Sequence, residues 1–131
     1  MRTRRRMLDK YAKSLEVEPE KITFNAMDEA LLKRAMAIVE KNMDNIEFST
    51  DEFAREMNMS RSNLHLKLKA ITGESTIDFI RKIRFNEAAK LLKDGRYTVA
   101  EVSTMVGFNT PSYFATSFKK YFGCLPTEYS S

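Results

Sequence analysis

The stretch STIDFIRKIRFNEAAKLLKD, from Ser75 to Asp94, decides how this chain folds. Ser75 with Asp78 three residues later is typical of a helix start, and Gly95 is typical of a helix end. The apolar residues between these signals recur at helical spacing and form a wide stripe: Ile77, Phe79, Ile80, Ile83, Phe85, Ala88, Ala89, Leu91 and Leu92. A stripe of this width predicts a long helix that packs on two sides and connects two bodies.

Two similar segments flank this connecting helix. SNLHLKLKAITG (residues 62–73) aligns with SYFATSFKKYFG (residues 112–123) at an offset of fifty residues. A second short helix is expected before each copy, so the sequence predicts two helix-turn-helix units. The twenty residues of the connecting helix would span about 30 Å. That length is close to the roughly 34 Å between successive major-groove faces of a DNA duplex.

Local signals place the ends of the individual helices. An amphipathic first helix is expected over residues 28–43, with Asn25 or a near neighbour as its cap, and Pro126 opens a last short helix. The residues expected to cap the four helices of the two units are Ser49, Ser60, Thr98 and Thr110. Asn58 and Gly107 stand where each turn requires a positive φ. We find no alternating strand pattern, so the expected fold is all-α.

Composition limits the class of protein. A chain of 131 residues suits one domain or two very small ones, and 43% apolar with 31% charged residues is typical of a soluble globular protein. A net charge of +4 favours anionic partners only mildly. The absence of a long apolar run and the single cysteine, Cys124, predict a cytoplasmic fragment without membrane contact. One histidine and no nucleophile or phosphate-loop motif argue against an enzyme.

The run VAEVSTMVGFNTPSYFATSFKKYFGCLPTEY (residues 99–129) resembles the second helix-turn-helix of AraC/XylS-type transcriptional regulators. The shared features are Gly-Phe in the turn, Ser-Tyr-Phe, Phe-Lys-Lys, and Gly followed by Pro-x-x-Tyr. The resemblance covers about residues 28–131 and includes the pattern Arg84, Ala88, Leu91, Leu92 of the connecting helix. It implies a seven-helix module: one helix-turn-helix over 50–72, a linker helix over 75–94 and a second helix-turn-helix over 98–123.

The first residues differ from the rest of the chain. RTRRRM (residues 2–7) is a dense basic cluster, and residues 1–24 are expected to be a basic linker from an upstream domain. A solvated basic end without a role is the alternative. The segment also resembles the junction after a receiver domain in two-component regulators, including hybrid sensor proteins. This resemblance implies an output domain whose intact protein carries an upstream receiver or sensor domain.

The resemblance implies that helices 60–71 and 110–122 enter adjacent major grooves of double-stranded DNA. A helix in a major groove reads base edges with its N-terminal turns, and positions 64, 68 and 71 are expected in the core. The expected base contacts are Arg61, Ser62, His65, Leu66, Pro111, Ser112, Ala115 and Thr116. The expected phosphate contacts are Lys67, Lys69, Thr110, Lys119 and Lys120. Arg61 is suited to a guanine and Leu66 to a thymine methyl group.

Several residues admit more than one interpretation. His65 is either a base contact or a plain surface histidine, and it lacks partners at metal-ligand spacing, so neither a metal nor a cofactor is expected. Three cations of the connecting helix either face phosphate or pair with acids such as Glu101: Arg81, Lys82 and Arg84. An aromatic group at helical spacing is expected in the core rather than as a base-stacking platform: Tyr113, Phe114, Phe118, Tyr121 and Phe122.

Two functions fit these patterns. The first is a sequence-specific DNA-binding transcription regulator, an activator that also contacts RNA polymerase. The second is a helical interaction module that docks a receiver or a polymerase and binds DNA weakly and non-specifically. Thr116 keeps the second open, because many members of the family carry arginine at that position.

Overall fold

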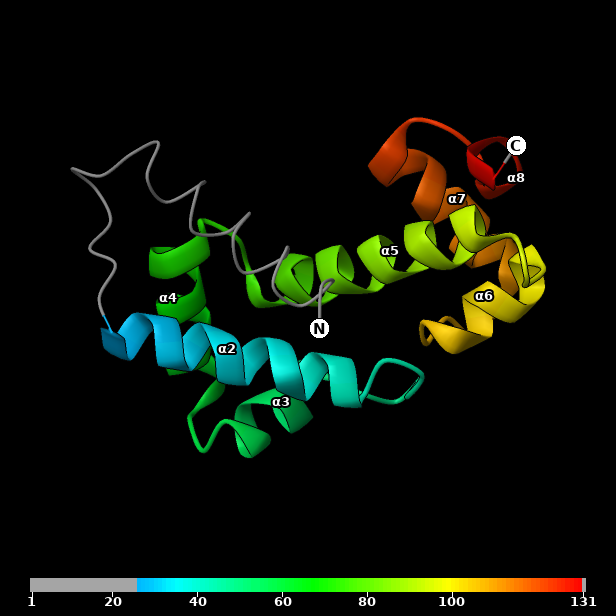
Figure 1. Ribbon diagram of the computed structural model, residues 1–131. Coiled ribbons are helices and arrows are strands. Elements are labelled where there is room, and N and C mark those ends of the chain that lie inside the picture. Colours follow the sequence, from blue (N-terminus) through cyan, green and yellow to red (C-terminus); the bar gives the residue numbers. More distant parts are fainter. Residues whose placement is uncertain (1–25, 131) are drawn as a thin grey trace. The chain divides into compact units, whose positions relative to one another are not determined.

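The computed structural model describes residues 26–130 of the chain. This part contains seven α-helices and no strand (Figure 1): α2 (Ala26–Lys41), α3 (Thr50–Glu56), α4 (Arg61–Thr72), α5 (Thr76–Asp94), α6 (Val99–Met105), α7 (Pro111–Phe122) and α8 (Pro126–Ser130). The all-α fold with two helix-turn-helix units and a long helix between them is confirmed. The predicted linker over residues 1–24 and the expected cap Asn25 lie outside the described residues.

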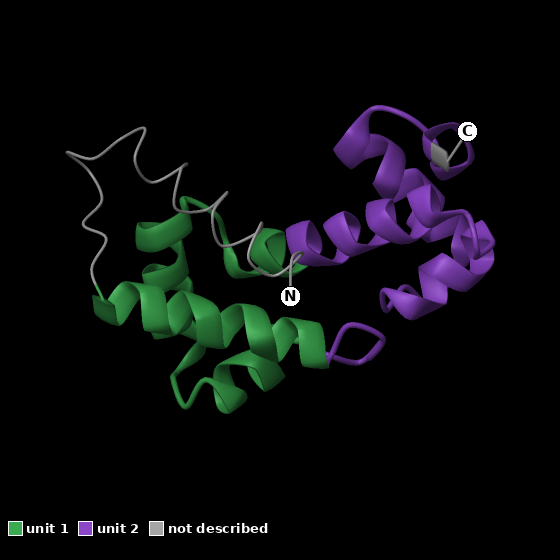
Figure 2. Ribbon diagram, in the orientation of Figure 1, with its two compact units in different colours: residues 1–41, 49–80 green, residues 42–48, 81–131 purple. Residues whose placement is uncertain are grey.

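The chain divides into two compact units (Figure 2). Within the described residues, unit 1 comprises residues 26–41 and 49–80, and unit 2 comprises residues 42–48 and 81–130. Helix α5 supplies residues to both units. Phe79 in unit 1 is fully buried and Phe85 in unit 2 is nearly so, which confirms that this helix packs on two sides.

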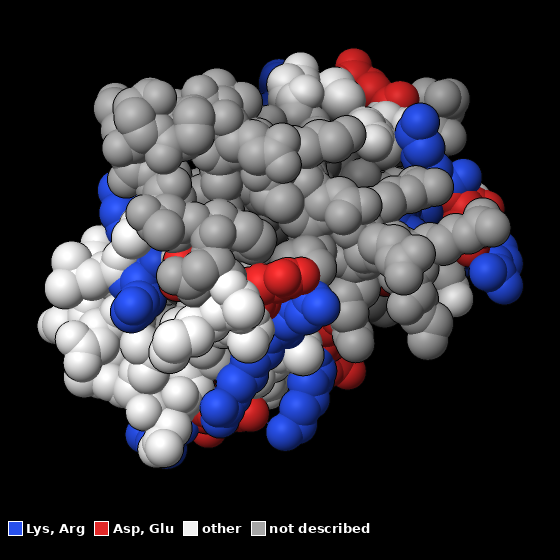
Figure 3. All heavy atoms as spheres, turned by 60° about the vertical axis from the view of Figure 1, so that its left-hand side comes forward, with Lys and Arg blue, Asp and Glu red and all other residues white. Residues whose placement is uncertain are grey.

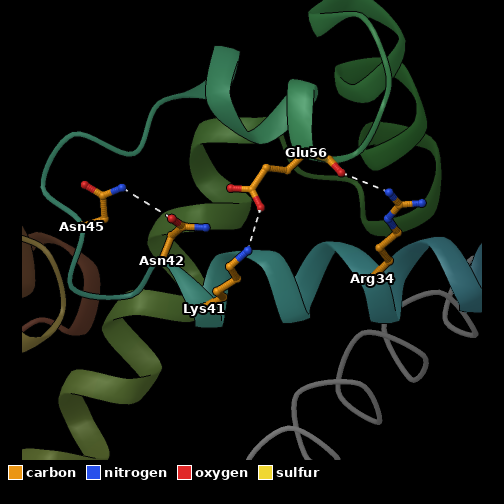
Figure 4. A network of polar contacts seen from close by, with 5 residues as sticks. All are labelled: Arg34, Lys41, Asn42, Asn45 and Glu56. Atoms are coloured by element: carbon orange, nitrogen blue, oxygen red, sulfur yellow. Dashed lines mark hydrogen bonds and ion pairs between the residues drawn. The ribbon is translucent and has the colours of Figure 1, made fainter.

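Unit 1 is built from α2, α3, α4 and the start of α5. Helix α2 contacts α3 and α4, and α3 contacts α4. The fully buried side chains of these elements include Leu32, Ala35, Val39, Phe53, Leu64, Leu68 and Phe79. Two polar contacts join α2 to the end of α3 (Figure 4). Arg34 Nη2 donates to the Glu56 carbonyl at 3.1 Å, and Lys41 Nζ meets the Glu56 carboxylate at 3.5 Å.

The first helix ends earlier than its apolar pattern predicts. Helix α2 stops at Lys41, and the chain turns at once: Asn45 N donates to the Asn42 carbonyl at 3.0 Å, and Asn45 Nδ2 donates to Asn42 Oδ1 at 3.4 Å (Figure 4). Met43, expected to extend the helix, lies in this loop and packs against the core of unit 2. The apolar side chain of Met43 therefore belongs to the core of unit 2 and not to the apolar stripe of α2.

The predicted helix caps are present. Ser49 Oγ accepts from Glu52 N at 3.2 Å, and Thr98 with Glu101 forms a complete capping box. Ser49 and Glu52 have the same spacing but do not form a complete box; the Glu52 carboxylate pairs with Arg55 Nη1 at 2.7 Å. The turn after α3 contains Asn58 with φ of 62°, the one non-glycine residue with positive φ within residues 26–130. An asparagine tolerates this conformation better than residues with bulkier side chains.

Asn58 gives a prediction about the first turn. Asn58→Ala should lower the free energy of unfolding by about 1 kcal/mol, because a left-handed conformation strains a plain Cβ. Asn58→Gly should stay near the wild type, since glycine adopts positive φ without strain. Urea unfolding followed by circular dichroism would measure both. An alanine variant as stable as the glycine variant would contradict the assignment.

Unit 2 has an aromatic core around Phe85. The Phe85 ring lies 5.4 Å from Phe108, 6.4 Å from Phe114 and 6.2 Å from Phe118, measured between ring centroids. The buried cluster also contains Ala88, Leu92, Val102 and Val106. Not every aromatic residue of α7 follows the prediction of a core position: Tyr113 is 53% exposed and Tyr121 is 42% exposed. Both rings lie at the edge of the core: Tyr121 is 4.9 Å from Phe85 and Tyr113 is 5.7 Å from Phe108, measured between ring centroids.

Arg84 was expected either to face phosphate or to pair with an acid such as Glu101, but it bonds to backbone carbonyls instead. Its side chain is buried, and Nη2 donates to the carbonyls of Asn42 at 3.2 Å and Asn45 at 3.0 Å. Nη1 donates to the Gly107 carbonyl at 3.4 Å. Burial lowers the pKa of the guanidinium, and the carboxylate of Asp44 opposes that shift. Arg84 thus joins the loop after α2 to the turn between α6 and α7, all within unit 2. The alternatives for Arg81 and Lys82 stay open.

Candidate nucleic-acid interface

Helices α4 and α7 are the second helices of the two helix-turn-helix units, and they share one local design. Each has twelve residues, a hydroxyl side chain as N-cap and a left-handed glycine as C-cap. Ser60 Oγ accepts from Asn63 N at 3.1 Å, and Thr110 Oγ1 accepts from Tyr113 N at 3.2 Å. These bonds fix where each helix begins, and so which side chains occupy its first turns.

The first turns of α4 and α7 contain no acid. Each of the other five helices in the described part of the chain carries at least one: Asp28 and Glu29, Asp51 and Glu52, Asp78, Glu101, and Glu128. A carboxylate at a helix N-terminus is favourable, because the helix dipole places partial positive charge there. In these two helices alone, no acid of the helix's own first turn offsets the positive end, which suits an external anion such as phosphate.

The side chains of α4 divide cleanly between core and solvent. Leu64, Leu68 and Ile71 are buried, as their spacing predicts. All six residues of this helix that were expected to contact DNA are exposed: Arg61, Ser62, His65, Leu66, Lys67 and Lys69. Leu66 is 64% exposed, so its apolar side chain is accessible on this face. Their contacts with DNA remain predictions.

A hollow of about 550 Å³ lies beside this face of α4. It gathers four of the expected base-contact residues with five residues that were not expected at the interface: Thr50, Arg61, Ser62, Leu64, His65, Leu66, Ser75, Thr76 and Ile77. Ile77 was expected within the buried stripe of the connecting helix, yet it is 55% exposed. Arg81, one turn further on, is also exposed. Residues four apart lie on the same side of a helix, so the charged Arg81 was the available signal that Ile77 is outside the buried stripe.

One acid reaches the α4 face from the neighbouring helix. Asp51, in the first turn of α3, accepts from Arg61 Nη1 through Oδ1 at 3.1 Å. Both side chains remain largely solvated, at 62% and 65% exposure. The sequence pattern showed Asp51 only as part of a helix start, because nothing local indicates that residues ten positions apart meet.

Helix α7 offers a less charged face. Pro111, Ser112, Thr116, Lys119 and Lys120 are exposed, as is the cap Thr110, and Ala115 is half-buried. Thr116 Oγ1 donates to the Ser112 carbonyl at 3.0 Å. This bond uses the hydroxyl hydrogen of Thr116 within the helix, so the side chain can offer a base its methyl group and its hydroxyl oxygen as an acceptor, but no donor. Thr110 accepts in its cap, and its own hydroxyl hydrogen is suited to a phosphate.

Charge alone does not mark the interface. Figure 3 shows lysine and arginine groups next to carboxylates on one face of the described surface. Exposed ion pairs such as Lys33 with Glu29, 3.6 Å apart, have the same mixed character. Within residues 26–130 no helix has the length and hydropathy to cross a bilayer. The same residues hold no group of three or more His, Cys, Asp and Glu side chains suited to a metal ion.

Comparison with known proteins identifies a family that matches this part of the chain. The family described as a helix-turn-helix domain matches residues 53–131. A histidine kinase, P4, from Formosa agariphila is 37% identical over 131 residues, which is 100% of this chain and 10% of that protein. The chain therefore spans about a tenth of the length of this relative, and about a third of the curated transcriptional regulators RhaR and MtrA.

Solved structures share the fold. The C-terminal domain of AraT, a response regulator from Geobacillus stearothermophilus, has a TM-score of 0.71 and 31% identity, over 76% of this chain and 83% of that chain. The DNA-binding domain of the transcriptional factor AdpA, solved in complex with a target DNA, has a TM-score of 0.69 and 24% identity, over 76% of this chain and 88% of that chain. The second likeness shows the fold alone.

Proposed function

This chain belongs to the AraC/XylS-type helix-turn-helix family and is a DNA-binding domain of a transcription regulator, not an enzyme; from that premise we propose that α4 and α7 enter successive major grooves of one duplex and read its sequence. The observation that carries the proposal is that α4 and α7, alone among the described helices, have no acid in their first turns. Phosphates supply the negative charge that those helix ends lack.

The two helices have different tasks in this proposal. Helix α4 supplies the directional contacts: Arg61 pairs with a guanine, His65 and Ser62 bond to base edges, and Leu66 contacts a thymine methyl group. Helix α7 reads mainly through small apolar surfaces, because the Thr116 hydroxyl hydrogen is held by its own backbone. Phosphate contacts that orient both helices come from Lys67, Lys69, Thr110, Lys119 and Lys120.

The length of α5 supports two half-sites about one turn apart. Its 19 residues span about 28 Å at 1.5 Å per residue, against the 34 to 36 Å that separate half-sites one helical turn apart. A binding selection from random duplexes, carried out with this chain at moderate salt, tests the proposal. We expect one preferred sequence with two conserved blocks at that spacing. A pool without any preferred sequence would refute the proposal.

Arg61→Ala should flatten the preference at one base pair, lowering discrimination there by about tenfold, because a bidentate arginine–guanine contact is worth about 1 to 3 kcal/mol. The matched contrast is Lys119→Ala, which should weaken all sequences alike and reduce the salt slope by about one unit. Arg55→Ala, an exposed arginine paired with Glu52 on α3, should leave base preference unchanged. Equal losses on all sequences for Arg61→Ala would contradict base reading by this residue.

The second candidate is an interaction module with weak, non-specific DNA binding. The use of the Thr116 hydroxyl hydrogen within the helix and the non-polar side chain of Ala115 favour it, since both limit the hydrogen bonds that α7 can donate to a base. In the same selection this candidate would give binding that falls steeply with salt and shows no sequence preference. The two candidates are therefore separated by one assay.

We also propose that the intact protein is controlled by an upstream receiver or sensor domain. The support is the similarity of all 131 residues of this chain to part of a histidine kinase, together with the similarity to the response regulator AraT. Activation of transcription through a contact with RNA polymerase, and action in the cytoplasm, belong to the same proposal. Phosphorylation-dependent DNA binding by the full-length protein, compared with this chain alone, would test that control.

A further inference from the structure

We propose that Asp51 is a positioning residue that holds the guanidinium of Arg61 in the orientation needed to read one base pair. The inference rests on the proposed function, since it assigns a role to a neighbour of a proposed base contact. It concerns a residue on α3, outside the reading helix. The role is specific to the first helix-turn-helix unit.

The geometry leaves the guanidinium able to read a base while it is held. Asp51 Oδ1 accepts from Arg61 Nη1 at 3.1 Å. A guanidinium has five N–H donors in a planar fork, so one bond to a carboxylate leaves donors for the two acceptors that a guanine presents. The carboxylate restricts the rotation of a long, otherwise flexible side chain. Less freedom is then lost when the arginine binds its base.

The pair is not needed to stabilise unit 1. Both side chains are more than half exposed, and exposed ion pairs contribute little to stability. Nor does α3 need Asp51 for its cap, because Ser49 caps it. In the second unit the matching helix positions, the second residue of α6 and the first of α7, hold Ala100 and Pro111. The acid and the arginine are thus both present in one unit and both absent from the other.

An acid beside a DNA-binding face costs affinity for phosphates, and the favourable effect of a first-turn carboxylate on the α3 dipole is also supplied by Glu52. Once a duplex covers this face and displaces water, the attraction between carboxylate and guanidinium becomes stronger. Rotamers of Arg61 that abandon Asp51 are then disfavoured. The expected consequence is a gain in discrimination between bases, with a small loss in affinity for DNA of any sequence.

The experiment compares Asp51→Asn with Glu52→Gln in this chain, using the selected duplex, duplexes that carry each alternative base pair at the Arg61 position, and a scrambled duplex. The control removes one negative charge from the same helix turn, and Glu52 pairs with Arg55 rather than with Arg61. Both variants should bind the scrambled duplex somewhat more tightly than the wild type. Only Asp51→Asn should lose discrimination at the Arg61 position, by about three- to tenfold.

A double-mutant comparison completes the test. In an Arg61→Ala background, Asp51→Asn should cause no further loss of discrimination, because the residue it positions is gone. If Arg61→Ala flattens the preference and Asp51→Asn does not, or sharpens it, the positioning role alone is overturned. If Arg61→Ala leaves the preference intact, the role of Arg61 in the proposed function fails and the inference falls with it.

Discussion

Replacing Gly107 by alanine should lower the free energy of unfolding by about 3 to 4 kcal/mol, because left-handed strain adds to overpacking. Gly107 has φ of 81°, and a Cβ there would lie 2.6 Å from the Met43 carbonyl oxygen and 2.8 Å from Arg84 Cζ. The carbonyl belongs to the backbone and cannot rotate away as a flexible side chain could. The turn between α6 and α7 would have to move, and α7 with it.

Gly95→Ala is the matched control for this effect. Gly95 has nearly the same conformation, with φ of 78°, but an added Cβ there meets nothing within 4 Å. Its substitution should cost only the conformational term, about 1 kcal/mol. Urea unfolding of both variants, followed by circular dichroism, measures the difference. Equal losses at the two positions would show that the close approach at Gly107 has no energetic weight.

Replacing Arg84 by methionine should lower the free energy of unfolding by about 3 kcal/mol, because three backbone carbonyls lose bonds to a charged donor. Methionine keeps much of the buried volume, so the loss reports hydrogen bonding more than packing. Arg81→Met is the control, since Arg81 is exposed and lies three residues earlier on the same helix. An Arg84→Met variant as stable as Arg81→Met would contradict the role of the guanidinium.

The two substitutions should not be additive. The Cβ added by Gly107→Ala would collide with Arg84 Cζ and Nη1 as well as with the Met43 carbonyl. Once Arg84 is replaced by methionine, part of that collision is relieved by a more flexible side chain. The double variant should therefore be more stable than the sum of the single losses predicts, and an additive result would place the strain on the Met43 carbonyl alone.

Local chemistry made most helix boundaries predictable. A hydroxyl at an N-cap satisfies backbone donors within its own turn, and a glycine or asparagine with positive φ ends a helix or opens a turn, so these signals act over a few residues. Ser60, Asn58 and Gly107 are such cases, and each has the predicted role. Met43 shows the limit, because its apolar side chain fits the period of α2 but packs into unit 2.

The candidate site was predictable only where it depends on the periodicity of a single helix. The spacing of Leu64, Leu68 and Ile71 placed those residues in the core and left the other face of α4 to solvent. The hollow that brings Ile77 beside Leu66, and the pairing of Asp51 with Arg61, were not predictable. Both join segments that are separate in the chain, and no periodicity within one helix encodes such a meeting.

By itself, then, the sequence determined the all-α fold, the two helix-turn-helix units and the exposed face of α4, because capping and helical periodicity operate within a few residues of one another. Only the tertiary structure decided the position of the Arg84 side chain. Its guanidinium is buried and bonds to three backbone carbonyls that are distant from it in the chain. It also decided which acid meets Arg61. Long side chains choose partners by proximity in the folded chain, and that proximity exists only after the helices have packed.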